Sequence, residues 1–369
     1  MKSLIPITIL LLTSNFGYSQ AGAPASPCYD LFNFNQSGLA LKEALAKKIT
    51  ETHTYILSYA EAENAIRFTD LDPDDATKTN LLLVYGFGPS VCTAENSPET
   101  NTENDDRRRN KNFDGVNSCQ WNREHTFAKS LGSPNLGDFD AGADVHHLRP
   151  SDVERNADRG NKKFAIGFGN SGTVGSDWYP GDEWKGDIAR MMMYMYLRYG
   201  DQCLPENVGV GIPVTNDPAM IDLFLNWNAE DPVSQLEDNR NTYLGNASNR
   251  YGQGNRNPFI DNPYLATLIW GGTKAENRWP EVFLSSTDFN LLSSVIIYPN
   301  PTKNNRIDIQ TETVVDEISL TNVNGQLIQY SKKPKLENNT YSLENVTKGF
   351  YFLKLTANNQ SITKKVIVN

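Results

Sequence analysis

Apolar side chains recur every three to four residues in two long stretches of the chain, which is the spacing of an amphipathic helix. The first stretch spans residues 39–59, and its apolar positions are Leu41, Ala44, Leu45 and Ile49. The second spans residues 187–199, where Ile188, Met191, Met192, Met195 and Tyr199 form one apolar stripe. Such a stripe predicts a helix packed into a core. Further helices are predicted at residues 218–227 and 231–241, and residues 264–270 form a final apolar element of the domain.

A different pattern begins at residue 295, where short apolar runs alternate with turn residues. The runs are residues 296–298, 307–309, 318–321, 326–330, 350–355 and 362–368. Asn324-Gly325 is a hairpin signal between two of them. We therefore predict a small all-β sandwich at residues 295–369, preceded by a linker at residues 276–294. It has neither histidine nor cysteine, so we expect no catalysis there.

The segment from Cys119 to Phe164 holds three of the four histidines. Residues 120–127 can form a strand, residues 131–142 a loop, and residues 145–148 a second strand that ends before Pro150. The following Ser-Asp-Val-Glu run (residues 151–154) is a capping-box pattern that opens a helix. The predicted order is strand, loop, strand, helix. Together with the other helices it indicates an α+β domain.

This segment contains what metal-assisted phosphodiester hydrolysis requires. A hard cation such as Mg²⁺ prefers oxygen ligands and keeps several waters, so the Glu124 carboxylate and the Asn156 amide oxygen could hold it. His125 can act as the general base. Adjacent side chains on a strand point to opposite faces, so Glu124 and His125 share a site only at a strand end or a bulge.

Other interpretations use the same residues differently. His146 and His147 would diverge on a strand and would rarely bind one zinc ion, and no HExxH or CxxC spacing occurs. A structural role is the alternative for both, with one ring satisfied by Asp144 or a backbone carbonyl. We expect His53 to be an ordinary packed or surface histidine. A secreted zinc hydrolase and an inactive exported binding module are the competing functions.

The N-terminus predicts export. Lys2 precedes an apolar run at residues 4–12 that is too short to span a bilayer, and Gly17 and Ser19 suit a signal peptidase, which gives a signal peptide at residues 1–19. We expect no integral membrane segment after its cleavage. Export favours disulfides. Three pairings are open to Cys28, Cys92, Cys119 and Cys203.

The formal charge of −10 argues weakly against a general nucleic-acid coat protein. Residues 107–163 nevertheless carry 11 Lys and Arg against 8 Asp and Glu. An acidic body with one locally basic segment suits an enzyme that contacts a polyanion at one groove, although scattered solvated charges explain it equally well. Arg107 to Arg109 are expected in a solvated loop, with a phosphate-contacting loop as the sharper alternative.

The central segment resembles the secreted bacterial endonuclease I family of ββα-metal (His-Me finger) nucleases. The resemblance spans residues 25–275, within an expected nuclease domain at residues 20–275. Its first block comprises residues 121–125, 144–150, 156, 159–161 and 164. Its second block comprises residues 227, 231–233, 237, 240–241 and 253–261.

The resemblance implies that His125 is the general base and that Glu124 and Asn156 hold one divalent ion, usually Mg²⁺, with Mn²⁺ or Ca²⁺ as alternatives. It also implies cleavage of DNA, and in some relatives RNA, to 5′-phosphate products with little sequence preference. Family members often carry a phosphate-gripping arginine before the Asp-x-His-His run, but residues 133–143 contain none. The substitutes are Arg149, Arg159 and Arg123. The groups expected to support the site are Asp144, His146, His147 and Asn161.

The C-terminal domain resembles the sorting domain of the type IX secretion system. The matching residues are Tyr298 to Pro301, Asn324-Gly325 and Lys348 to Tyr351. The resemblance implies recognition by the secretion machinery, usually followed by removal of the domain. The protein is then secreted or held at the cell surface. A β-sandwich binding module is the alternative.

Overall fold

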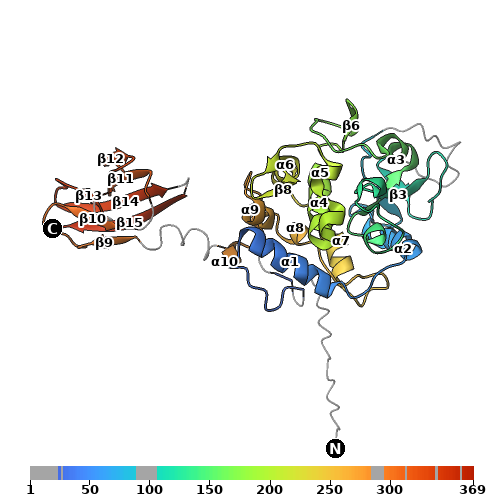
Figure 1. The fold of residues 1–369 in the computed structure, drawn as a ribbon, viewed down its shortest axis with the longest axis horizontal. Coiled ribbons are helices and arrows are strands. Elements are labelled where there is room, and N and C mark those ends of the chain that lie inside the picture. Colours follow the sequence, from blue (N-terminus) through green and yellow to red (C-terminus); the bar gives the residue numbers. More distant parts are fainter. Residues whose placement is uncertain are drawn as a thin grey trace, which may run out of the picture. The chain divides into compact units, whose positions relative to one another are not determined.

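The computed structural model describes residues 24–25, 28–88, 106–283, 295–311, 314–336, 340–357 and 360–369. It divides the chain into two compact units, Met1–Trp279 and Pro280–Asn369, which are drawn in Figure 1. The expected signal peptide, most of the expected linker and Cys92 lie outside the described residues. No helix within these ranges is long and apolar enough to cross a membrane.

The first unit is built around α4 (Lys185–Tyr199), which is buried from Gly186 to Leu197. Its four methionines are at most 1% exposed, so the expected packing of the methionine stripe is confirmed. Figure 1 shows α4 among the other helices of the unit, with β3, α2 and α3 beyond it. Those helices are α1 (Gly38–Thr52), α2 (Tyr59–Thr69), α3 (Val153–Arg159), α5 (Pro205–Val208), α6 (Asp222–Glu230), α7 (Gln235–Gly245), α8 (Pro258–Asp261) and α9 (Tyr264–Trp270).

The strands of this unit form four short antiparallel pairs. Those pairs are β1 (Asn80–Leu82) with β2 (Arg108–Asn110), β3 (Trp121–His125) with β4 (Leu148–Asp152), β5 (Gly172–Val174) with β6 (Asp177–Tyr179), and β7 (Pro213–Val214) with β8 (Asp217–Ile221). One-turn 3-10 helices cover Lys129–Leu131, Asp140–Ala143 and Gly200–Cys203. Mixed helices and small sheets make the unit α+β.

Several expected boundaries were wrong. The helix predicted at residues 39–59 ends at Thr52, and α2 follows as a separate helix. Ser58 caps α2 by accepting from the Glu61 amide, while the Glu61 carboxylate accepts from the Ser58 amide at 2.9 Å. This capping box was the sequence signal for α2.

The second strand of the hairpin begins three residues later than predicted, and Pro150 lies inside it rather than after it. Proline has no amide proton to donate, and the outer side of a two-stranded sheet tolerates that loss. The carbonyl of Pro150 still accepts from Val84 at 2.9 Å. His146 and His147 therefore lie in a turn before β4.

Four other predictions need correction. Residues 217–221 form β8 before α6 begins, and α7 starts after the capping box of Ser234 rather than at residue 231. Arg109 lies in strand β2, not in a solvated loop. The expected linker begins too early, because Trp279 packs against Tyr29 and Phe34 with ring centroids 5.4 and 5.3 Å apart. A further short helix, α10 (Pro280–Phe283), follows.

The second unit consists of two antiparallel sheets that share one apolar core. Ile307, Ile309 and Tyr341 of one sheet face Leu320, Leu353 and Val366 of the other. One sheet has the order β13-β10-β9 and the other β12-β11-β14-β15. Their strands are β9 (Ile296–Tyr298), β10 (Ile307–Gln310), β11 (Glu317–Asn322), β12 (Leu327–Lys332), β13 (Thr340–Leu343), β14 (Gly349–Ala357) and β15 (Gln360–Val368).

Two cysteines depart from the expected pairing. Cys28 and Cys203 are both buried free thiols, so the expectation of a disulfide is wrong for these two. Burial raises the pKa of both thiols, which keeps them protonated and unreactive. Cys92 lies outside the described residues, so a disulfide that involves it stays a prediction.

Candidate active site

The hairpin of β3 and β4 leads directly into α3, and this order positions the candidate site. In the antiparallel register Glu124 lies opposite Arg149, and His125, the last residue of β3, lies opposite Leu148. Asp152 ends β4 and caps α3, because its side chain accepts from the amides of Glu154 and Arg155 at 3.0 and 3.2 Å. The cap fixes where α3 begins against the hairpin.

The two faces of β3 contact different helices. On one face, Asn156 of α3 bonds to Asn122 at 2.7 Å, and Arg159 of α3 pairs with Glu124 at 2.9 Å. Arg123 and His125, which alternate with Asn122 and Glu124 along β3, contact α2 instead. Side-chain alternation along the strand explains this division. His125 is the last residue of β3, and its side chain lies on the α2 face of the strand, opposite the face on which Glu124 contacts α3.

Glu124 is 2% exposed and is held by two donors. The Tyr85 hydroxyl and the Arg159 guanidinium both donate to Oε1, each at 2.9 Å. These bonds orient the carboxylate, which also accepts a hydrogen bond from the backbone of His125. Burial raises the pKa of Glu124, while the neighbouring Arg159 and Tyr85 oppose that rise.

The His125 ring is oriented through one nitrogen. Nε2 lies 3.0 Å from the Gly142 carbonyl oxygen. A carbonyl can only accept, so Nε2 carries the proton and Nδ1 is the basic nitrogen. Tyr59 stacks on the ring at 5.8 Å with an angle of 21°, and the His147 ring lies 5.6 Å away. Burial, with a smaller contribution from His147, lowers the pKa of His125 to about 3, so the ring is neutral and able to accept a proton.

Asn156 is oriented by its amide nitrogen. Nδ2 donates to the Asn122 side chain at 2.7 Å and to the Arg123 carbonyl at 3.1 Å. Both partners are acceptors at these contacts, which assigns the nitrogen to this side and turns Oδ1 the other way. One carboxylate oxygen and one amide oxygen suit a hard divalent ion. Within the described ranges no three His, Cys, Asp or Glu side chains cluster as a metal site, and a Glu-Asn pair is not such a cluster.

The other expected supporting residues lie around this pair. Asp144 is buried and accepts from Tyr194, Tyr199 and Gln253 at 2.7, 2.9 and 2.9 Å. His146 bonds to the Asn255 carbonyl at 3.1 Å, and His147 bonds to the Ala141 carbonyl at 2.8 Å. Both rings are buried, which fits the structural alternative for them. The exposed Asn161 donates to Ser130 at 3.3 Å.

The two arginines expected to grip phosphate lie in the core instead, and both are 0% exposed. Arg159 binds Glu124 and donates to the carbonyls of His125 and Thr126, each at 2.8 Å, so it holds the end of β3. Arg149 donates to Asp70 at 2.6 Å and to Asp187 at 2.8 Å. A phosphate in solvent reaches neither guanidinium.

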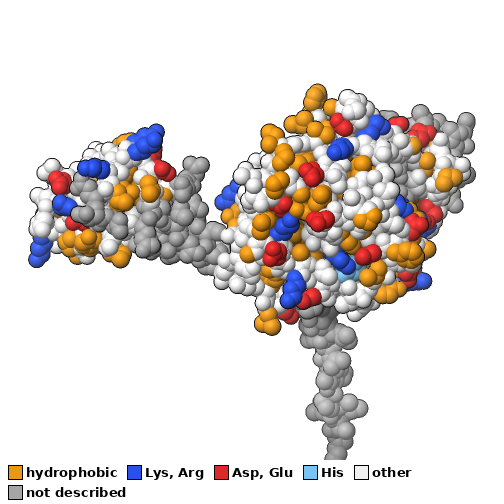
Figure 2. All heavy atoms as spheres, in the orientation of Figure 1, with side chains coloured by type: hydrophobic (Ala, Val, Ile, Leu, Met, Phe, Trp, Pro, Cys, Tyr) orange, Lys and Arg blue, Asp and Glu red, His pale blue; other side chains and the backbone are white. Residues whose placement is uncertain are grey.

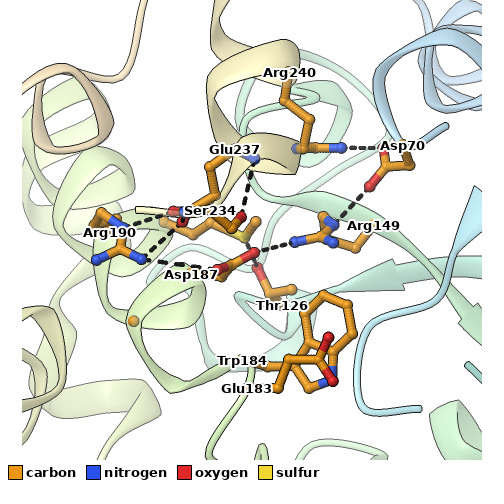
Figure 3. A network of polar contacts seen from close by, with 12 residues as sticks. Asp70, Thr126, Arg149, Glu183, Trp184, Asp187, Arg190, Ser234, Glu237 and Arg240 are labelled. Atoms are coloured by element: carbon orange, nitrogen blue, oxygen red, sulfur yellow. Dashed lines mark hydrogen bonds and ion pairs between the residues drawn. The ribbon is translucent and has the colours of Figure 1, made fainter. Parts of the chain in front are cut away.

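Arg149 belongs to a buried network of alternating charges, shown in Figure 3. Asp187 continues to Arg190 at 3.8 Å, Arg190 pairs with Glu237 at 2.6 Å, and Arg240 closes the other end on Asp70. The network joins β4 to α4, α7 and the end of α2. Glu237 and Arg240, which belong to the second sequence block, therefore support the hairpin from a distance of about ninety positions along the chain.

The sequence analysis missed two tyrosines. Tyr85, fully buried, holds Glu124 although its backbone has the left-handed φ of 71°, a conformation that is uncommon for a non-glycine residue and often found at functional sites. Tyr59, the first residue of α2, holds the ring of His125. Only the capping box at Ser58 marked this position; nothing in the pattern marked Tyr85.

The surface charge of the first unit is mixed. Figure 2 shows basic and acidic side chains interspersed on the visible face, without one broad patch of a single sign. Contact with a polyanion therefore depends on a few local cations rather than on a general positive field.

Comparisons with known proteins match the two units to two families. The family model for endonuclease I matches residues 37–264, and the model for a secretion system C-terminal sorting domain matches residues 296–369. An extracellular ribonuclease of Bacillus subtilis (strain 168) is 37% identical over 267 residues, which are 67% of this chain and 82% of that protein. An extracellular ribonuclease of Bacillus amyloliquefaciens is 38% identical over 246 residues, 64% of this chain and 75% of that protein.

Proposed function

Because the chain belongs to the endonuclease I family, we propose that it is a metal-dependent endonuclease that hydrolyses DNA and RNA with little sequence preference. Its nuclease activity and its export follow from the family models: the first unit is a nuclease, and the sorting domain directs the chain through type IX secretion to the cell surface or the extracellular space. The metal, the substrate range and the site residues belong to the proposal.

The observation that carries the proposal is the orientation of the His125 ring at the end of β3. The bond from Nε2 to the Gly142 carbonyl holds the ring, and the basic Nδ1 is free to take a proton from water. The low pKa of His125 keeps this nitrogen unprotonated at neutral pH. Water is the nucleophile in this proposal, and the 5′-phosphate product is what the family resemblance implies.

Glu124 and Asn156 would hold the divalent ion, with Mg²⁺ as the preferred candidate and Mn²⁺ or Ca²⁺ as alternatives. When bound, such an ion supplies stabilisation of the negative charge that develops on the phosphate and the leaving oxygen. Arg159 and Tyr85 fix the Glu124 carboxylate, and Asn122 fixes Asn156. Since Arg159 already neutralises Glu124, we expect weak metal binding that the substrate phosphate strengthens.

The relatives named extracellular ribonucleases support RNA as a substrate. Hydrolysis by water needs no 2′-hydroxyl, so the same site is expected to cut DNA. A ribonuclease that used the 2′-hydroxyl would instead leave a cyclic phosphate and would spare DNA. The alternative of an inactive exported binding protein requires that neither polymer be cut.

Plasmid DNA and a single-stranded RNA test the proposal with the purified mature protein, in Mg²⁺ and in chelator. We expect metal-dependent cleavage of both, with 5′-phosphate ends detected by ligation. Cleavage of RNA alone with cyclic phosphate ends would contradict the mechanism. Absence of cleavage in any divalent ion would favour the binding protein.

A further inference from the structure

Arg149 and Arg159 are buried, so a cation that can reach a phosphate near His125 has to come from another residue. Helix α2 runs alongside β3, and three of its residues one turn apart meet the strand in order. Tyr59 stacks on His125, Glu63 pairs with Arg123 at 3.1 Å, and Arg67 lies 5.3 Å from the Trp121 ring. Arg123 is thus placed on the same face of the strand as the candidate base.

Two cations meet at the Tyr59 ring. The Arg123 guanidinium lies 3.6 Å from the ring centroid, and the Lys129 ammonium lies 4.9 Å from it. Arg123 also donates to the Tyr59 backbone carbonyl, which fixes its position. The cation–π contact and this bond hold the Arg123 guanidinium beside the His125 ring, in addition to its ion pair with Glu63.

Both cations can change partners. The carboxylate partner of Lys129 is Asp138, whose side chain is 61% exposed, while the Lys129 side chain is 34% exposed. An exposed ion pair of this kind is weak, so an entering phosphate can replace Asp138. The Arg123 side chain is 14% exposed, and its partner Glu63 is 33% exposed.

We propose that Arg123 and Lys129, held on the ring of Tyr59, bind a backbone phosphate of the substrate beside His125. This inference rests on the proposed function and names the phosphate-binding residues of that site. Tyr59 is a positioning residue in this arrangement, since its ring holds both cations and the His125 ring. The pair takes the role that residues 133–143, which contain no arginine, leave unfilled.

The salt dependence of DNA binding tests the proposal directly. Each phosphate contact contributes about 0.9 to the slope of log K against log salt for duplex DNA. We would measure binding of a short duplex by the mature protein in the His125→Ala background, in chelator, so that nothing is cut. Lys129→Gln is expected to lower the slope by about 0.9, and Arg123→Gln and Tyr59→Leu are expected to lower it as well.

Matched variants separate this role from simple stabilisation. Lys47→Gln removes another exposed lysine with a carboxylate partner, Glu51 at 3.7 Å, and is expected to leave the slope unchanged. Tyr59→Phe keeps the ring and is also expected to keep the slope. If Arg123→Gln fails to fold, Lys129→Gln still decides, because Lys129 lies at the surface.

A slope unchanged in Lys129→Gln would overturn the proposal. If the wild-type chain still cleaves plasmid in Mg²⁺ in that case, the phosphate site is wrong and the nuclease function stands. If the wild-type chain neither cleaves nor binds DNA, the proposed function fails, and the phosphate site fails with it.

Discussion

Replacement of Arg149 by methionine separates a scaffold role from a catalytic one. The Arg149 side chain is 0% exposed, as is Asp70, and Asp187 is 3% exposed. In Arg149→Met, Asp70 still forms its ion pair with Arg240. For Asp187 the remaining ion pair is the longer one with Arg190, at 3.8 Å. Removal of one partner from a buried ion pair costs about 3–5 kcal/mol, because a charge is left without compensation.

Urea unfolding followed by tryptophan fluorescence measures this loss. All six tryptophans lie between residues 121 and 279, so the signal reports the first unit alone. With a slope of about 3 kcal/mol per molar urea, the midpoint is expected to fall by roughly 1–2 M. Arg107→Met is the control, since its pair with Glu183 is 28% and 45% exposed and contributes at most about 1 kcal/mol. An Arg149→Met protein with wild-type stability and no cleavage would refute the scaffold role and restore Arg149 to the catalytic group.

Three further outcomes are expected. Burial lowers the pKa of His146 and His147 to about 4, below the ordinary value of 6.5. Between pH 4 and pH 6.5 the unfolded chain therefore binds more protons than the folded chain. The free energy of unfolding is highest above pH 6.5 and is expected to fall by on the order of 3 kcal/mol per ring on acidification toward pH 4. Urea midpoints that do not change across this range would contradict the neutral buried rings. Glu124→Gln and Asn156→Ala are each expected to weaken Mn²⁺ binding, measured by the electron paramagnetic resonance signal of the free ion. Titrations identical to wild type would exclude Glu124 and Asn156 as ligands. Since the pKa of His125 is lowered to about 3, the pH profile of kcat/KM is expected to lack an inflection near pH 6.5. An inflection near pH 6.5 that disappears when His125 is replaced would show that His125 has the ordinary pKa of a histidine.

The central site could be predicted from the sequence because its parts are local. Strand, loop, strand and helix follow one another within 45 residues. The Ser-Asp-Val-Glu run at residues 151–154 marked the start of the helix, although the expected capping box was wrong, because Asp152 rather than Ser151 is the N-cap. The alternation of side chains along a strand raised the correct question about Glu124 and His125. The structure places them on opposite faces of β3, with His125 at its end, and strand ends are poorly marked in a sequence.

The phosphate-binding arginines could not be predicted in the same way. Arg123, Arg149 and Arg159 are alike in type and in distance from the histidines along the chain. Which of them is accessible depends on partners far away in sequence, such as Asp70 and Asp187 for Arg149. Tyr85 was missed for a similar reason, since only the folded chain brings its hydroxyl to Glu124. Local patterns therefore identified the chemistry, whereas tertiary contacts decide which charges remain at the surface.

The role of His125 as general base is the central claim, and chemical rescue tests it most directly. His125→Gly leaves a space for free imidazole beside the ring of Tyr59. The account predicts that this variant cleaves DNA about 10²- to 10⁴-fold more slowly than wild type in Mg²⁺, that it binds DNA normally, and that added imidazole restores part of the rate. Cleavage by His125→Gly at the wild-type rate would contradict the account.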